Sequence, residues 1–262
     1  MISNHEIDYR IIGEEMQCVE IELDPQETVV AEPGSFMMMD DQIKMETIFG
    51  DGSSNTGGLM GKLFSAGKRL LTGENLFMTT YTNIGSGKKR ATFASPYPGK
   101  IIPMNLSDLG GKVICQKDAF LCAAKGVAVG IEFQRKLGTG LFGGEGFIMQ
   151  KLEGDGLAFV HAGGTIVEKT LAPGELLKID TGCIVAFTKD INYDIQFVGG
   201  IKNTLFGGEG VFFATLTGPG KVWIQSLPIS RLASRIIQYG TKQRKEEGSI
   251  LGGLGNLLDG DS

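Results

Sequence analysis

The chain has 262 residues, is 42% hydrophobic and carries a formal net charge of −5. This length and composition are sufficient to bury a substantial core in one or two domains. The acidic balance argues against a broad phosphate-binding surface, because affinity for nucleic acid depends largely on clustered Lys and Arg. We therefore do not expect a nucleic-acid partner.

No stretch of the chain approaches the roughly 18 consecutive apolar residues of a membrane-spanning helix. The first residues also lack the basic segment and apolar core of a secretory signal. We expect a cytoplasmic protein and leave open a peripheral association with a membrane. The cysteines form no CxxC pair, which predicts reduced, buried side chains; they are Cys18, Cys115, Cys122 and Cys183.

Strand-like alternation dominates the first part of the chain. The predicted strands cover residues 17–23, 28–31, 35–39 and 76–81. Three consecutive methionines, Met37 to Met39, lie in the third of these strands. Because side chains alternate between the two faces of a strand, we predict that at least one of the three is in the core.

A glycine-rich insertion interrupts this first β region. Between residues 57 and 71, Leu59, Leu63 and Phe64 follow a spacing near that of a helix, which predicts a short amphipathic helix or an ordered loop. If these three side chains are exposed, they form a candidate partner-binding patch.

Two further β regions repeat the pattern of the first. The predicted strands of the second and third regions cover residues 100–106, 147–152 and 157–162, then 165–171, 211–216 and 221–226. Each region ends in a hairpin with a glycine-rich turn, at residues 85–87, 154–156 and 218–220. The pattern is typical of an all-β protein rather than of alternating strands and helices.

A helix follows the last strand. Pro228 favours a helix start, and the pattern predicts a helix from Ile229 to about Tyr239 that ends at Gly240. Leu232, Ile236 and Tyr239 are predicted to face inward. Residues 241–262 are charged and then rich in Gly and Leu, which predicts a disordered tail, with a partner-binding role for its leucines left open.

A short Gly-Glu phrase recurs once in each β region. It reads Gly73-Glu74-Asn75, Gly144-Glu145-Gly146 and Gly208-Glu209-Gly210. Self-similarity at a period of about 65–70 residues predicts one structural unit used three times. We expect β subdomains at 1–98 (with the insertion at 50–73), 99–163 and 164–227. The helix at 228–240 and the tail at 241–262 follow, and residues 1–240 form one body.

Glu74, Glu145 and Glu209 allow two interpretations. Three carboxylates related by symmetry could converge on a cation or a polar ligand. Alternatively, each accepts hydrogen bonds from nearby glycine N–H groups and orders a tight turn, or pairs with a basic residue such as Arg69, Arg135, Lys136 or Lys202. This structural interpretation needs no ligand and is the one we favour.

The sequence contains partial matches to motifs for cofactor binding, but none of them has the full pattern that the motif requires. A literal GxGxxG at residues 138–143 precedes a strand-like run rather than a helix, so dinucleotide binding is not expected. A near match to a P-loop at residues 57–62 has Leu63 where Mg²⁺ needs Ser or Thr. His5 and His161 are far apart in sequence, and we expect His161 to be a structural or surface residue rather than a ligand. We predict no catalytic residue, no metal site and no cofactor.

The triple unit, the insertion that ends Lys68-Arg69-Leu70-Leu71-Thr72-Gly73-Glu74, and the closing Trp223-Ile224-Gln225-Ser226 together resemble the AIM24 family of uncharacterised proteins, which includes the DUF124 group. The resemblance covers about residues 1–239. It implies three tandem β-sandwich subdomains of double-stranded β-helix type about a pseudo-threefold axis, a fold similar to the tryptophan RNA-binding attenuation protein. Eukaryotic relatives are associated with mitochondria, but an Arg-rich presequence is not apparent here. The resemblance supplies no catalytic residues.

Three hypotheses about function follow. The first is a non-enzymatic binding or scaffold protein that presents loops and the C-terminal helix to a protein or membrane-associated partner. The second is a protein that binds a small ligand or an ion in clefts between subdomains or at the glutamate trio. The third is an enzyme of unrecognised type. Homo-oligomers are compatible with all three, because the edges of β-sheets need covering.

Overall fold

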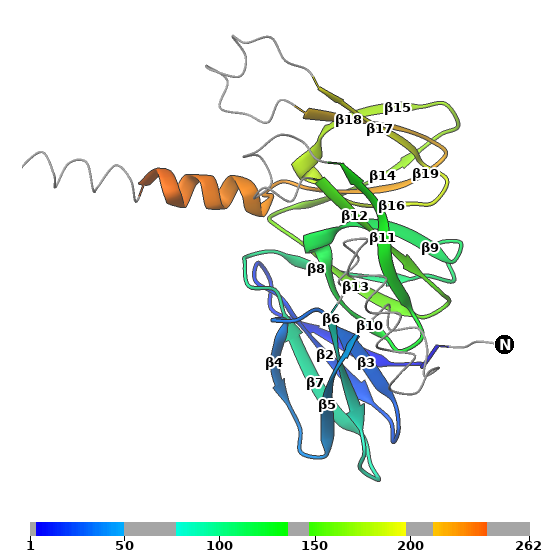
Figure 1. Cartoon of the computed structure of the whole chain (residues 1–262), viewed down its shortest axis with the longest axis vertical. Coiled ribbons are helices and arrows are strands. Elements are labelled where there is room, and N and C mark those ends of the chain that lie inside the picture. The colour runs from blue at the N-terminus through cyan, green and yellow to red at the C-terminus, as the bar shows by residue number, and fades with distance from the viewer. Residues whose placement is uncertain (1–3, 50–76, 136–146, 198–211, 240–262) are drawn as a thin grey trace, which may run out of the picture.

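The computed structural model describes residues 4–49, 77–135, 147–197 and 212–239. Strands make up most of these residues, and one helix spans residues 229–239 (Figure 1). The predicted all-β class with a short C-terminal helix is therefore confirmed. The helix has the predicted start at Ile229 and continues to Tyr239.

The described strands run in chain order as follows: β1 Asp8–Ile12, β2 Cys18–Leu23, β3 Thr28–Ala31, β4 Phe36–Met39, β5 Ile43–Phe49, β6 Phe77–Asn83, β7 Lys89–Ala94, β8 Lys100–Asn105, β9 Lys112–Gln116, β10 Phe120–Ala124, β11 Ala128–Arg135, β12 Phe147–Glu153, β13 Leu157–Ala162, β14 Ile166–Leu171, β15 Leu176–Asp180, β16 Ile184–Thr188, β17 Asn192–Phe197, β18 Phe212–Thr217 and β19 Gly220–Gln225. Short 3-10 turns at Lys117–Ala119 and Thr181–Cys183 precede β10 and β16. The predicted strands at 17–23, 28–31, 35–39 and 76–81 correspond to β2, β3, β4 and β6, and those of the two later regions correspond to β8, β12, β13, β14, β18 and β19. The other described strands were not predicted.

Three consecutive sets of six strands share one pairing pattern. We call β2–β7 unit 1, β8–β13 unit 2 and β14–β19 unit 3. In each unit the first, sixth and third strands lie side by side in one sheet, and the second, fifth and fourth lie side by side in another. The predicted glycine-rich hairpins join the fifth strand of each unit to the sixth.

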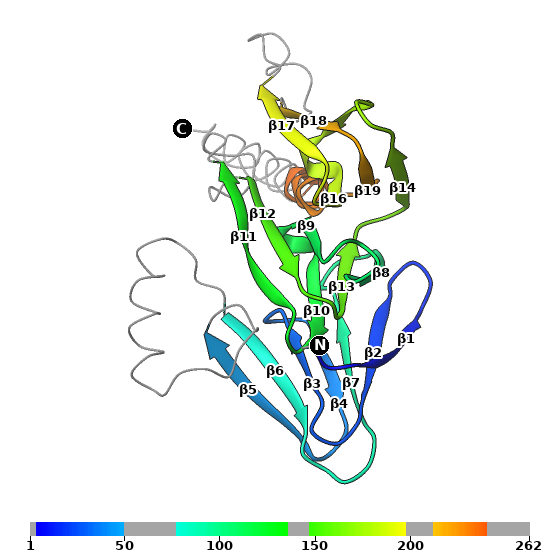
Figure 2. The same cartoon turned by 90° about the vertical axis from the view of Figure 1, so that its right-hand side faces the viewer.

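Neighbouring units are joined by continuous sheets. The second strand of unit 1, β3, pairs antiparallel with the third strand of unit 2, β10. In the same way β9 of unit 2 pairs with β16 of unit 3. The units consequently follow one another along the long axis of the molecule, with units 1 and 3 at opposite ends (Figures 1 and 2). The predicted pseudo-threefold axis is not confirmed, and the division of the chain at 98, 163 and 227 stays a prediction.

The core also continues from unit to unit. One cluster of buried side chains contains Val30 of unit 1, Val113 and Leu152 of unit 2, and Val185 and Trp223 of unit 3. Apolar residues on strands of adjacent units share this cluster, so burial of apolar surface holds the units together as well as stabilising each of them.

Two predictions about buried side chains are wrong. Met37, Met38 and Met39 are 55%, 48% and 40% exposed, because β4 lies at the edge of its sheet with no described strand beyond it. Ile236 and Tyr239 are 63% and 74% exposed. The helix projects away from the described sheets after its first turn, so none of these sheets lies against its later turns (Figure 1).

Several predicted features lie outside the described residues. They are the insertion with Leu59, Leu63 and Phe64, the glutamates Glu74, Glu145 and Glu209, and the tail at 241–262. Within the ranges that the structure describes, no helix is long and apolar enough to cross a membrane.

Candidate functional site

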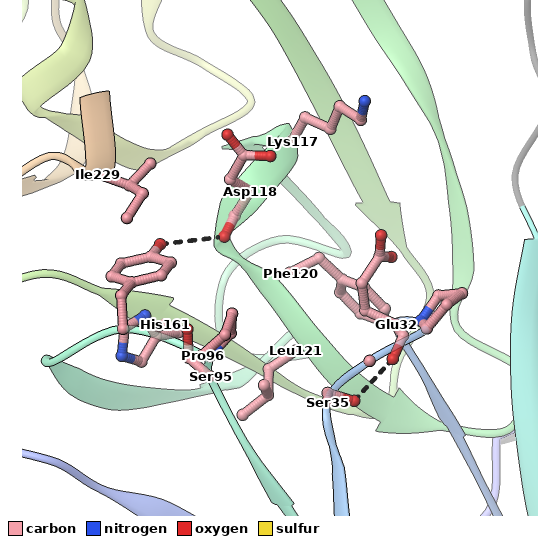
Figure 3. A pocket seen from close by; sticks show the side chains of 13 residues that line it. Glu32, Ser35, Ser95, Pro96, Lys117, Asp118, Phe120, Leu121, His161 and Ile229 are labelled. Atoms are coloured by element: carbon pink, nitrogen blue, oxygen red, sulfur yellow. Dashed lines mark hydrogen bonds between the residues drawn. The ribbon is translucent and has the colours of Figure 1, made fainter. Parts of the chain in front are cut away.

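A pocket of about 570 Å³ lies where units 1 and 2 meet (Figure 3). Unit 1 contributes residues 32–35, which link β3 to β4, and residues 95–97, which follow β7. Unit 2 contributes the turn before β10, the start of β10 and His161 of β13. Ile229, the first residue of the C-terminal helix, completes the wall. Segments of unit 1, of unit 2 and of the C-terminal helix thus converge on one cavity.

Glu32 is held on the pocket wall by its backbone. Its N–H donates to the carbonyl oxygen of Leu121 at 3.0 Å, and its carbonyl oxygen accepts from the Ser35 hydroxyl at 2.7 Å (Figure 3). The carboxylate atom Oε2, in contrast, is buried and has no hydrogen-bond partner among the described residues. Burial raises the pKa of Glu32 to about 7; nearby Lys117 lowers it and Asp118 raises it further.

His161 faces the pocket from β13 and is 2% exposed. Its ring packs edge-on against Tyr97, with 4.5 Å between the ring centroids. The ring also needs the absence of a side chain at Gly99, where a Cβ would come within 2.7 Å of Cε1 and Nε2. Burial lowers the pKa of His161 to about 4, so the imidazole is neutral at pH 7. Its Nδ1 is buried without a hydrogen-bond partner in the described part of the chain.

Tyr97 closes one side of the pocket. Its hydroxyl donates to the backbone oxygen of Asp118 at 3.2 Å, which links unit 1 to the turn before β10. Burial, with a further contribution from Asp118, raises the pKa of Tyr97 to about 12. The phenol therefore stays protonated and keeps this hydrogen bond throughout the physiological range of pH.

The same frame recurs between units 2 and 3 with neutral residues. Gln225 of β19 occupies the position in unit 3 that His161 of β13 occupies in unit 2. In each unit, the residue just before it on the sixth strand pairs with the first residue of the third strand. Its Oε1 accepts from Gly163 N at 2.8 Å, and its Nε2 donates to the carbonyl oxygen of Gly182 at 2.9 Å and to Gln116 Oε1 at 3.4 Å. This junction is closed by hydrogen bonds.

The partner positions correspond as well. Gln116 is the last residue of the second strand of unit 2, just before the 3-10 turn, and Glu32 directly follows β3, the second strand of unit 1. The matching registers of the two inter-unit pairings place these two residues at equivalent positions. The junction of units 2 and 3 therefore has glutamines where the junction of units 1 and 2 has Glu32 and His161. Among the described residues, the side chains of one junction are closed by hydrogen bonds, whereas the other junction carries titratable groups with buried polar atoms that have no partner.

This arrangement is suited to binding. A buried carboxylate that lacks a partner favours a ligand that brings a hydrogen-bond donor or a positive charge, since such a group repays the cost of burial. Phe120 and Leu121 supply buried apolar surface beside it. No group of three or more His, Cys, Asp or Glu side chains with metal-binding geometry occurs in the described residues.

The sequence did not single out this site. The predicted ligand residues lie outside the described ranges, whereas Glu32, Tyr97 and His161 come from separate segments that show no motif. A signal was nevertheless present: alignment of the three repeats would have placed His161 beside Gln225 and Glu32 beside Gln116.

The fold and the pocket define a class of protein, namely an all-β repeat protein with a cavity between units. The chain belongs to the AIM24 family: the family model described as "Mitochondrial biogenesis AIM24" matches residues 9–227. The resemblance inferred from the repeats is thus confirmed at the level of the family.

Two similar proteins come from Streptococcus pyogenes. The chain is 30% identical over 223 residues to an uncharacterised protein of serotype M6, with 84% of this chain and 86% of the relative covered. It is also similar to the crystal structure of a protein from the same species, with a TM-score of 0.69 and 24% identity over 89% of this chain and 100% of the other. The second likeness supports the fold alone.

Proposed function

We propose that this protein is a non-enzymatic binding protein and that the pocket between units 1 and 2 holds a small molecule. This proposal takes the inter-unit cleft from the second hypothesis drawn from the sequence. A scaffold role for Leu59, Leu63 and Phe64 or for the tail remains a separate prediction, as does the fold similarity to the tryptophan RNA-binding attenuation protein.

One observation carries the proposal. Glu32 Oε2 and His161 Nδ1 both lack hydrogen-bond partners within the described ranges, and both residues line the same cavity. Each unpaired buried polar group costs roughly 1–3 kcal/mol. At the equivalent junction of units 2 and 3, Gln225 avoids this cost through its three hydrogen bonds. A stability cost that one copy of the frame avoids and the other retains is expected at a binding site.

The chemistry of the wall selects the ligand class. Phe120, Leu121 and Ile229 favour an apolar body. Glu32 favours an N–H or O–H donor and, once ionised, a protonated amine. Since the pKa of Glu32 is about 7, an amine bound beside the carboxylate should lower that pKa and displace a proton from the protein near neutral pH.

Three matched probes test this proposal: benzylamine, benzyl alcohol and benzoate, each titrated into the protein and followed by ligand-observed NMR. We expect benzylamine to bind most tightly and benzoate most weakly. As the pH increases toward 7, the affinity for benzylamine should rise by up to about tenfold per pH unit, because ionised Glu32 is the binding form. Above pH 7 the affinity should level off.

Glu32→Gln should remove the preference for the amine and its pH dependence. The control is Glu46→Gln on β5, an exposed carboxylate paired with Lys44 at 2.9 Å and absent from the pocket wall. Equal binding of the three probes to the parent protein, or an unchanged preference in Glu32→Gln, would contradict the proposal.

A further inference from the structure

The third strands of the three units differ sharply in exposure. All five residues of β10 and all five of β16 are buried, whereas all four of β4 are exposed. The sequence of β4 is nevertheless as apolar as the others: Phe-Met-Met-Met, against Phe-Leu-Cys-Ala-Ala and Ile-Val-Ala-Phe-Thr. Unit 1 therefore exposes an edge of a kind that units 2 and 3 cover.

The cover is always the second strand of the preceding unit. β3 lies on β10, and β9 lies on β16. No unit precedes unit 1 within the described residues, and β4 pairs only with β7 among the described strands. No unit follows unit 3 in the same ranges, and its second strand, β15, pairs only with β18 there. Each end of the molecule thus carries one half of a pairing that the interior uses twice.

The two free edges are also matched in detail. A bulge falls at the second residue of each third strand: Phe36 and Met38 face consecutive positions of β7, just as Phe120 and Cys122 face consecutive positions of β13. Ile184 and Ala186 do the same against β19. The free strand of unit 1 therefore has the backbone shape of the two strands that accept a neighbour.

The internal pairings predict a register. Cys122 faces Ala31 in one junction, and Ala186 faces Cys115 in the other. Met38 is the counterpart of Cys122 and Ala186, because all three directly follow the bulge in their strand. Ile179 is the counterpart of Cys115, because both lie two residues before the 3-10 turn of their unit. The same register sets Met38 opposite Ile179, and Met39 opposite Lys178.

We infer that β4 of one molecule binds β15 of a second copy of this chain. The resulting sheet would join β17, β18 and β15 of one copy to β4, β7, β2 and β1 of the next, in the order that the interior sheets already follow. The association is head to tail, so it leaves a free edge at each end and extends to longer arrays or closes into a ring of several copies.

A second copy is the occupant because the chain itself contains both halves of the pairing. Closure within one chain does not fit the described arrangement, since units 1 and 3 lie at opposite ends of the molecule in both views (Figures 1 and 2). Apolar edges such as β4 commonly recruit another strand, whereas protected edges carry charges or proline. β4 has neither.

Directed disulfide formation tests the register. A Met39→Cys protein and a size-tagged Lys178→Cys protein are mixed under mild oxidation and resolved on a non-reducing gel. Facing residues of antiparallel strands bring their Cβ atoms to about 4.5–5.5 Å, close to the separation that a disulfide spans. We expect a mixed product at least five times more abundant than that of Met39→Cys with tagged Lys169→Cys, an exposed position on β14.

The unsubstituted protein, oxidised in parallel, sets the background from Cys18 and Cys183, which are partly exposed. A mixed product no stronger than the Lys169 control would overturn the inference. A doubly substituted protein that links only within one chain, with no mixed product, would overturn it in favour of closure of single chains.

Mass in solution provides a second test that needs no cross-link. Sedimentation of the parent protein should show a mass that rises with concentration, and Met38→Lys should weaken the association at least tenfold by placing a charge on the edge. Because Met38 is 48% exposed, the thermal stability of the Met38→Lys protein should match that of the parent. A parent protein of single-chain mass up to about 1 mM would refute the association.

Discussion

His161 and Gln225 occupy the same position in two copies of one structural unit, and only Gln225 has both polar atoms of its side chain hydrogen-bonded to described residues. Gln225 bonds to Gly163, Gly182 and Gln116, whereas the Nδ1 atom of His161 has no partner in the described part of the chain. A repeat protein thus provides its own comparison: the backbone frame is shared, so the difference between the two junctions lies in the side chains.

Replacing Glu32 with Gln should stabilise the protein at high pH. The pKa of Glu32 is about 7 in the folded state against 4.5 for the free side chain, so the folded state binds the extra proton between these values. Stability is therefore lost as pH rises from about 4.5 to 7, and Glu32→Gln abolishes that loss. We expect a gain of up to about 3 kcal/mol at pH 8 and little change near pH 4.5 in urea unfolding.

Glu46→Gln serves as the control for this experiment, because Glu46 is exposed. Its unfolding curve should stay close to that of the parent at both pH values. A Glu32→Gln protein that is less stable than the parent at pH 8 would show that the carboxylate has a partner.

Replacing His161 with Gln should make the protein more resistant to acid. The pKa of His161 is about 4 when folded against 6.5 when free, so the unfolded state binds more protons between these values. Stability is consequently lost as pH falls from 6.5 to 4. His161→Gln should remove up to about 3 kcal/mol of this dependence, as measured by urea unfolding across that range.

His5 provides the comparison for His161. Burial lowers its pKa too, and its Nδ1 accepts the N–H of Thr28 at 2.9 Å. His5→Gln should therefore leave the contribution of His161 in place. An acid dependence that is unchanged in His161→Gln would refute the assignment to His161.

Replacing Gln225 with Leu should destabilise the junction of units 2 and 3. The substitution removes three hydrogen bonds and leaves the Gly163 N–H and the Gly182 carbonyl without their partner. We expect a loss of about 2–4 kcal/mol in the free energy of unfolding, measured with urea at pH 7. Gln17→Leu is the control with a smaller expected loss. The Gln17 side chain accepts its shortest hydrogen bond, 2.8 Å, from the N–H of Ile101, so this variant should lose about 1 kcal/mol in the free energy of unfolding. Equal losses in the two variants would contradict this account.

Replacing Gly99 with Ala should disturb the site through packing alone. A Cβ at this position would overlap the carbonyl oxygen of Ala162 and press on the ring of His161. We expect a loss of about 2 kcal/mol or more in thermal or urea unfolding. Gly87→Ala is the matched control, since no atom lies within 4 Å of a Cβ built there. Comparable stability of the two variants would show that the loop at Gly99 moves freely.

Part of this structure could be predicted from local signals. The alternation in Cys18–Leu23, the apolar run Leu157–Ala162 and the glycine-rich hairpin turns identified strands and their connections, because these signals lie within a few residues of each other. The helix beginning at Ile229 was found for the same reason. The prediction that Ile236 and Tyr239 of this helix face inward was wrong, since the described sheets provide no surface for them to pack against.

The β class, the repeated unit and the C-terminal helix could be predicted from the sequence, since the period of the side chains and the turn residues act over short distances. Which edges are covered, and where the polar groups gather, depends on contacts between segments far apart in the chain. Met38 and Cys122 hold equivalent places in their units, yet one is exposed and the other buried. The difference arises because a neighbouring unit lies on only one of them, and that neighbour comes from a distant part of the chain.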